Sequence, residues 1–181
     1  MWDDFFDLIQ PVAARVPYMV CIGNHERDWP DSGSYYQGLD SGGECGVPHE
    51  RRFPMPRPSL DEAWYGFDYG SVHFVLMSTE HNFTQGSPQY KFLDQHMQGV
   101  DRSKTPWLIF AGHRPMYVDS SNNDPPAGDL PVAKLLRESV EPLLMKYKVD
   151  LALWGHNHSY QTTCPVYQKT KHTQHLSLIH I

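Results

Sequence analysis

Several features that would assign the chain to a whole class of proteins are missing from its sequence. No apolar run among its 181 residues approaches the roughly 20 residues that a membrane-spanning helix needs. The N-terminal residues Met1–Asp4 are acidic where an export signal would be basic. Lys and Arg do not cluster, and the net charge is -6. We therefore predict no membrane span, no export signal within this chain and no nucleic-acid partner.

Cysteine is also scarce. The three cysteines Cys21, Cys45 and Cys164 cannot all pair with one another, so a free thiol or an absent partner is expected, and the compartment stays open on this ground. What the chain does contain is 40% hydrophobic residues, enough for the core of one globular domain.

Short apolar runs alternate with helical patterns along the chain. Helical spacing of apolar residues predicts three helices, over 1–15, 90–100 and 132–147. Apolar or β-branched runs predict five strands, over 17–22, 64–69, 72–77, 107–111 and 149–154. A segment rich in Gly, Pro and Ser, 27–60, predicts a long surface loop with little regular structure. This alternation predicts an α/β fold built in layers.

Three of the expected strands end in a glycine that is followed by side chains able to bind a metal. These ends are Gly23–Glu26, Gly112–Tyr117 and Gly155–His158. Open α/β sheets place their ligand sites just beyond the carboxyl ends of the strands. The three ends are therefore expected to meet in one crevice.

The side chains at these ends are Asn24, His113, His156 and His158. Imidazole nitrogen suits divalent zinc, iron and manganese, and a neutral amide oxygen suits a harder ion. A single histidine is more often a surface or core residue than a ligand, but three matched strand ends favour the metal. His156 and His158 lie two residues apart and can face the crevice together, where Gly155 avoids crowding.

The three blocks, in this order, resemble the last three signature blocks of purple acid phosphatases, which belong to the calcineurin-like metallophosphoesterase superfamily. The context Asp40–Pro48 is similar as well. The resemblance covers roughly residues 1–170, as the C-terminal part of the catalytic domain. It implies a layered α/β/β/α metallophosphoesterase sandwich whose N-terminal strands are missing from this fragment.

The resemblance also implies a dinuclear centre and its ligands. Asn24, His113 and His156 would bind a divalent ion (Zn, Mn or Fe), and His158 would bind a neighbouring Fe(III). His25 would be the catalytic residue that donates to the substrate phosphate. Such a pair of ions activates water and stabilises charge during displacement at phosphorus. The implied reaction is hydrolysis of a small phosphomonoester.

Other polar residues have less definite roles. Arg114 could contact the substrate phosphate or support its own loop. Glu26, Arg27 and Asp28 are expected to form a solvated charged turn, unless they orient His25 or meet substrate. Asn82 begins a glycosylation sequon, which fits the secreted or extracellular habit that the resemblance implies.

The chain departs from the family pattern in ways that bear on activity. The family's earlier Asp-x-Gly and Gly-Asp-x-x-Tyr blocks do not occur ahead of Gly23, and the histidines that several members carry after the position of Tyr117 are missing as well. We therefore expect the fragment to bind one ion weakly and to be inactive alone. Two alternatives remain: another calcineurin-like phosphoesterase, which cleaves phosphodiesters or nucleotides, or a catalytically silent, phosphatase-like secreted glycoprotein.

Residues 171–181 are predicted to be a non-native tail. Lys171 stands where the family has a cysteine that would pair with Cys164, and Leu176–Ile181 resembles a translated transposon adapter from sequencing libraries. The histidines of this tail, His172, His175 and His180, are given no role.

Overall fold

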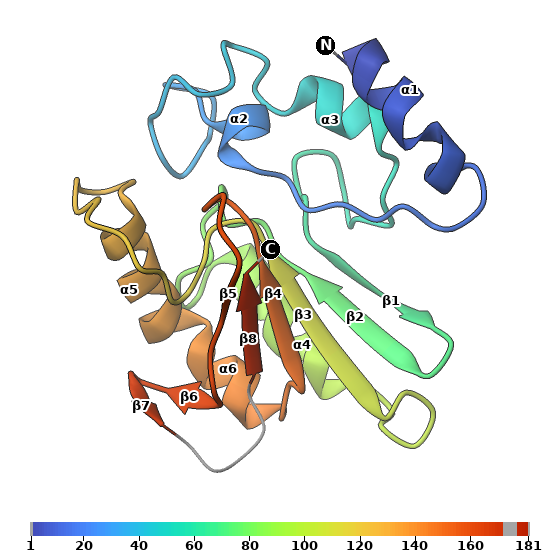
Figure 1. Cartoon of the computed structure of the whole chain (residues 1–181), viewed down its shortest axis with the longest axis vertical. Helices are drawn as coiled ribbons and strands as arrows, with labels where there is room; N and C mark the ends of the chain where they lie inside the picture. The colour runs from blue at the N-terminus through green and yellow to red at the C-terminus, as the bar shows by residue number, and fades with distance from the viewer. Residues whose placement is uncertain (1, 172–176, 181) are drawn as a thin grey trace.

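A computed structural model describes residues 2–171 and 177–180 and shows a mixed sheet with helices on one face (Figure 1). Six strands form the sheet, in the order β1 (Tyr65–Tyr69), β2 (Val72–Leu76), β3 (Trp107–Gly112), β4 (Leu151–Trp154), β8 (Ser177–His180) and β5 (Gln161–Thr162). The four inner strands run parallel, and the two edge strands run antiparallel to their neighbours. Two short strands, β6 (Val166–Tyr167) and β7 (Thr170–Lys171), pair separately.

The helices fall into two groups. The first group covers the sheet and comprises α4 (Pro88–Gln98), α5 (Asp129–Ser139) and α6 (Glu141–Lys146). The second group gathers beyond the carboxyl ends of the parallel strands (Figure 1) and comprises α1 (Trp2–Ala13), α2 (Asn24–Arg27) and α3 (Val47–Arg52). The end of the sheet that sequence patterns marked as functional therefore faces α2. None of the helices in the described part of the chain is long and apolar enough to cross a bilayer.

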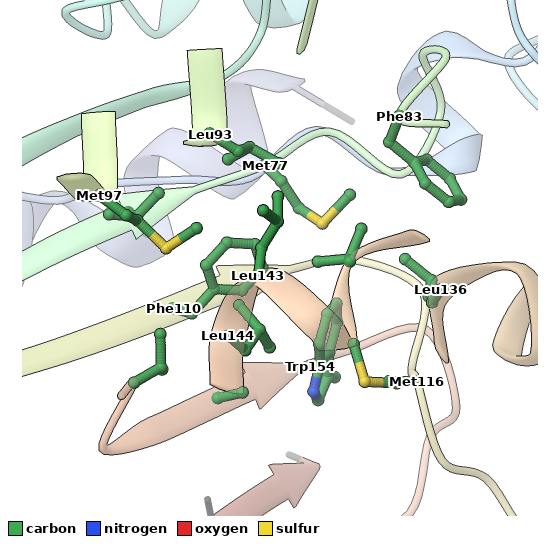
Figure 2. Close-up of a cluster of buried hydrophobic side chains, with 14 of the residues drawn as sticks. Met77, Phe83, Leu93, Met97, Phe110, Met116, Leu136, Leu143, Leu144 and Trp154 are labelled. Atoms are coloured by element: carbon green, nitrogen blue, oxygen red, sulfur yellow. The ribbon is translucent and has the colours of Figure 1, made fainter. Parts of the chain in front are cut away.

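The core lies between the sheet and α4–α6. Figure 2 shows side chains from β3, β4 and the helices meeting there, among them Phe110, Trp154, Leu93 and Leu144. Phe110 and Leu144 are each 0% exposed. Burial of such side chains contributes about 1.5–3 kcal/mol each relative to exposure, which holds β3 and β4 at fixed positions under the site.

The predicted hairpin and helices are largely confirmed. β1 and β2 pair antiparallel around Gly70, and α4 begins where Ser87 accepts a hydrogen bond from the Tyr90 amide. The helix expected over 132–147 is divided into α5 and α6 at Val140. Pro142 explains the division, because it has no amide hydrogen to continue the ladder of α5 and suits the first turn of a new helix.

The strand predicted over 17–22 is wrong. These residues run toward α2 without strand structure, and their described link to the hairpin passes through a side chain. The Tyr65 hydroxyl accepts from the Val20 amide at 3.2 Å and donates to the Val20 carbonyl at 2.9 Å. An apolar run becomes a strand only where another backbone pairs with it, and Tyr65 supplies a phenol instead.

The predicted α/β class is confirmed, with one large sheet and one helical layer on it. Residues 177–180 of the predicted tail form β8 beside β4, while His172 and His175 lie outside the described residues. The assignment of 171–181 to a non-native tail stays a prediction, as does the domain boundary at residue 170. Cys21, Cys45 and Cys164 are free thiols.

Candidate metal centre

Three oxygen and nitrogen atoms of a kind that can ligate a metal, from three separate segments, converge at the carboxyl end of the sheet. Asn24 begins α2, His113 follows β3, and His156 follows β4. The Asn24 Oδ1 lies 2.8 Å from His113 Nε2 and 3.2 Å from His156 Nδ1. The two imidazole nitrogens lie 3.2 Å apart. We call Asn24, His113 and His156 the ligand cluster.

The spacing of these atoms fits a divalent cation. Ligands at about 2.0–2.1 Å from one ion are separated by about 2.8–3.4 Å in octahedral (adjacent ligands) or tetrahedral coordination. The observed separations of 2.8, 3.2 and 3.2 Å fall within that interval. Two imidazoles and an amide oxygen also suit zinc, manganese or iron(II). When bound, such an ion acts as a Lewis acid and lowers the pKa of a bound water.

The third donor of the ligand cluster comes from an asparagine. Within residues 2–171 and 177–180, no group of three or more His, Cys, Asp or Glu side chains is arranged to hold a metal ion. The ligand cluster reaches three members only through Asn24, which is 6% exposed. A buried amide with its oxygen turned to two imidazoles gives the site a neutral third donor.

The histidines of the cluster are held in their neutral form. Burial lowers the pKa of His113 to about 3, and the charges of His156, Arg114, His25 and His158 act in the same direction. Burial also lowers the pKa of His156. A neutral imidazole offers a nitrogen lone pair to a cation, so the environment prepares both rings for metal binding.

Gly23 shapes the space around His113. A Cβ atom built at Gly23 would lie 2.9 Å from both Cε1 and Nε2 of His113. A Cβ at Gly155 would lie 3.6 Å from His113 Nδ1, an ordinary contact. The glycine that avoids crowding is therefore Gly23, and the role expected for Gly155 is not needed. The Glu26 carboxylate accepts from the Gly23 amide at 3.0 Å and fixes this turn.

His156 has an unusual backbone. Its φ angle is +68°, in the left-handed region that residues other than glycine rarely occupy. This backbone conformation accompanies the contact of its side chain with Asn24 and His113. The preceding residue, Gly155, donates its amide hydrogen to the His113 carbonyl at 2.8 Å. Such strained positions gather at functional sites, where the surrounding structure imposes them.

The remaining predicted ligand and catalytic residues lie at the rim of the site. His25 is exposed, with Nδ1 3.4 Å from the Asp40 carbonyl oxygen. His158 is exposed too, and its charge is felt at His113. The predicted roles of His25 toward substrate and of His158 toward a second ion stay predictions.

Arg114 lies in the protein interior rather than at the rim. It is 4% exposed, and its nitrogens donate to Glu80 at 2.9 Å, to Asp28 at 2.9 Å and to the Ala127 carbonyl at 2.8 Å. We call Arg114, Asp28 and Glu80 the ion-pair cluster. This placement gives Arg114 the loop-supporting role that the sequence left open, and its proposed contact with substrate has no observed basis in the geometry.

Two carboxylates beside the ligand cluster were missed by the sequence analysis. Asp40 accepts from Asn24 Nδ2 at 2.7 Å, and Asp129 Oδ1 lies 3.3 Å from His156 Nε2. Asp40 stood inside a block already recognised as similar to the family, which was the available signal. Asp129 carried no motif, and only its place at the start of α5 connects it to the site.

Comparisons with known proteins identify the family of the chain. Residues 1–160 match the family model described as calcineurin-like phosphoesterase. The Arabidopsis thaliana protein called "Probable inactive purple acid phosphatase 1" is 48% identical over 92% of this chain and 27% of its own length. The Hordeum vulgare protein called "Nucleotide pyrophosphatase/phosphodiesterase" is 42% identical over 92% of this chain and 45% of its own.

A solved structure extends the likeness to three dimensions. A purple acid phosphatase isolated from yellow lupin (Lupinus luteus) seeds matches with a TM-score of 0.87 and 39% identity, over 99% of this chain and 33% of that one. The chain spans about a quarter of the length of its Arabidopsis relative. Family model, relatives and fold agree with one another: the chain belongs to the calcineurin-like phosphoesterase family, within which it resembles the purple acid phosphatases.

Proposed function

We propose that the ligand cluster binds the divalent ion of a phosphatase centre that hydrolyses phosphomonoesters. The observation that carries this proposal is the convergence of Asn24 Oδ1, His113 Nε2 and His156 Nδ1 within 3.2 Å of one another. Exposed His25 beside the cluster would donate to the substrate phosphate. Hydrogen bonds to a phosphate from a nearby donor add to the charge that the ion stabilises.

The second ion, Fe(III) in the proposal, has His158 as its candidate ligand in this chain. Two adjacent cations repel each other strongly unless a carboxylate lies between them. Two described carboxylates beside the ligand cluster, Asp40 and Asp129, contact Asn24 Nδ2 and His156 Nε2, the atoms that face away from the cluster. We therefore propose that this chain binds one ion and that turnover requires carboxylate and tyrosinate ligands from the family's upstream blocks.

Turnover assays separate this proposal from its two rivals. The substrates are p-nitrophenyl phosphate, bis(p-nitrophenyl) phosphate and a nucleotide pyrophosphate, tested with this chain and with a longer protein in which the two upstream blocks precede it. We expect the longer protein to hydrolyse the monoester and the chain alone to be silent. Asn24→Ala should abolish turnover, whereas Asn123→Ala, at an exposed position, should not.

The relatives give each rival a specific basis. The barley relative's name favours cleavage of a phosphodiester or pyrophosphate, so turnover of those substrates alone would support the first rival. The Arabidopsis relative is called inactive, so a longer protein that binds metal without turnover would support the second. Monoester hydrolysis that survives Asn24→Ala would contradict the proposal itself.

We also propose that the protein is secreted and that Asn82 carries a glycan. Asn82 is exposed, and its side-chain oxygen accepts from the Thr84 amide at 2.9 Å and from the Thr84 hydroxyl at 2.8 Å, which presents the sequon in a tight turn. Expression through a eukaryotic secretory pathway should add a glycan mass that Asn82→Gln removes. An unmodified wild-type mass would contradict this assignment.

A further inference from the structure

Asp40 faces the amide of Asn24 from the side opposite the histidines. Its Oδ2 accepts from Asn24 Nδ2 at 2.7 Å. An ionised carboxylate only accepts hydrogen bonds, so the amide group must turn its nitrogen toward Asp40. The Asn24 oxygen is thereby turned toward His113 and His156. The reverse orientation would set oxygen against carboxylate in a residue that is 6% exposed.

Asp129 stands in the same relation to His156. Its Oδ1 lies 3.3 Å from His156 Nε2, and the two side chains are 13% and 20% exposed. An ionised Asp129 only accepts, so a hydrogen on Nε2 suits this contact and would leave a lone pair on Nδ1, which faces the ligand cluster. The Ser120 hydroxyl donates to the other oxygen of Asp129 and fixes its orientation.

These two contacts come from distant parts of the chain and share one effect. Asp40 lies 16 positions from Asn24, and Asp129 lies 27 positions from His156. Each carboxylate contacts the side-chain atom that points away from the ligand cluster. It thereby determines which atom of that side chain points toward the cluster. Partners of this kind raise metal affinity because they select the ligand's orientation and tautomer before the ion arrives.

We propose that Asp40 and Asp129 are positioning residues that select the atoms which Asn24 and His156 present to the metal ion. The inference rests on the proposed metal-binding role of the cluster. The plainer interpretation of Asp129 is an acidic residue favoured at the start of α5 by the helix dipole. That interpretation predicts no effect on the His156 tautomer, which makes the two accounts separable.

The first test is ¹⁵N NMR of the His156 ring in the metal-free chain, at a pH where the imidazole is neutral. We expect the Nε2–H tautomer to dominate, because the Asp129 carboxylate is a stronger acceptor than the Asn24 amide oxygen that lies 3.2 Å from Nδ1. Asp129→Asn keeps the shape but can either donate or accept, so we expect a mixture of the two tautomers. Asp119→Asn, at an exposed position preceding Ser120, is the matched control and should leave the tautomer unchanged. An unchanged tautomer in Asp129→Asn would overturn the role of Asp129.

The second test is calorimetric titration with Zn²⁺. We expect Asp129→Asn and Asp40→Ala each to weaken affinity by about 10- to 100-fold, the range that such partners show. Asp40→Asn, whose amide oxygen can still accept from Asn24, should weaken affinity less than Asp40→Ala. Equal affinities for wild type and all three variants would overturn the positioning roles.

The two tests also separate this inference from the proposed function. If the wild-type chain binds no Zn²⁺, the metal-binding proposal fails, whatever the tautomer of His156. If it binds Zn²⁺ through the ligand cluster but the carboxylate variants bind as tightly, only the positioning roles fail.

Discussion

Consecutive residues, His113 and Arg114, belong to two polar clusters with opposite properties. The ligand cluster brings together neutral donor atoms that contact one another and have lone pairs to offer a cation. The ion-pair cluster contains its own cation, because the Arg114 guanidinium lies between Asp28 and Glu80. The ion-pair cluster, whose charges are already paired, acts as a scaffold, whereas converging neutral oxygen and nitrogen donors form a candidate metal site.

The largest expected effect is a loss of stability when Arg114, the cation of the ion-pair cluster, is removed. Arg114→Ala leaves Asp28 and Glu80, which are each 0% exposed, without their shared partner. Breaking a buried pair on one side costs about 3–5 kcal/mol. Chemical denaturation should show this loss, whereas Arg51→Ala, on the exposed side of α3, should cost less than about 0.5 kcal/mol. A loss below about 1 kcal/mol for Arg114→Ala would remove the distinction between the clusters.

The same truncation one residue earlier should affect binding instead of stability. His113→Ala removes one of three donors and should lower Zn²⁺ affinity by about 100-fold or more, a larger loss than that expected for an orienting partner. Its free energy of unfolding without metal should change less than that of Arg114→Ala. His158→Ala is the matched control, because this exposed histidine lies outside the ligand cluster and should leave the affinity for one ion nearly unchanged.

Sequence patterns identified the ligand cluster better than the scaffold beside it. Asn24, His113 and His156 each follow a glycine at the end of an apolar run, and that local signal predicted that the three side chains would come together. Arg27 and Asp28 were expected in a solvated turn, yet they are 1% and 0% exposed. Their partners, Asp61 and Arg114, are far away in sequence, so nothing local marks them as buried.

The predictions of helices and strands divide in the same way, between features set by local sequence and features set by long-range contacts. Hairpin and helices depend on local periodicity and turns, and these were found. The strand at 17–22 depends on a pairing partner elsewhere, and residue 20 meets a tyrosine hydroxyl instead of a backbone. The positioning carboxylates also depend on long-range contact, and only the structure places Asp129 beside His156.

The burial of Asp28 gives the scaffold a pH dependence. Burial, followed by the charge of Glu80, raises the pKa of Asp28 from 3.8 to about 7. Because the folded-state pKa lies above the unfolded value, the folded chain binds more protons between about pH 4 and about pH 7. The contribution of Asp28 to the free energy of unfolding therefore falls as pH rises through that window, by at most about 4 kcal/mol.

Asp28→Asn isolates this contribution. Its amide oxygen can still accept from Ser34 or Arg114, and it does not titrate. Urea denaturation from about pH 4 to about pH 8 should give a smaller fall in stability for the variant than for wild type. Identical profiles for the two proteins would contradict the raised pKa of Asp28.

A steric test sharpens the comparison without changing any donor. Gly23→Ala places a Cβ 2.9 Å from the His113 ring, so the ring must shift. We expect Zn²⁺ affinity to fall about tenfold, as for loss of an orienting partner. Gly155→Ala meets nothing closer than 3.6 Å and is the control. Similar affinities for the two variants would show that the position of the His113 ring does not limit binding.

The smallest effect is expected at Tyr36, whose ring lies 4.6 Å from the Arg114 guanidinium carbon. Among the described residues, its buried hydroxyl has no hydrogen-bond partner. Tyr36→Phe retains the cation–π contact and removes an unsatisfied polar atom, so stability should rise by up to about 1 kcal/mol. A loss of more than about 1 kcal/mol in thermal or chemical denaturation would reveal a partner for the hydroxyl.

The central claim is that Asn24, His113 and His156 hold one divalent ion. Anomalous X-ray diffraction at the zinc edge, from crystals of the chain grown with Zn²⁺, tests it most directly. The account predicts an anomalous peak in contact with Asn24 Oδ1, His113 Nε2 and His156 Nδ1. An anomalous peak at another place in the molecule, with no zinc between these three atoms, would contradict the claim.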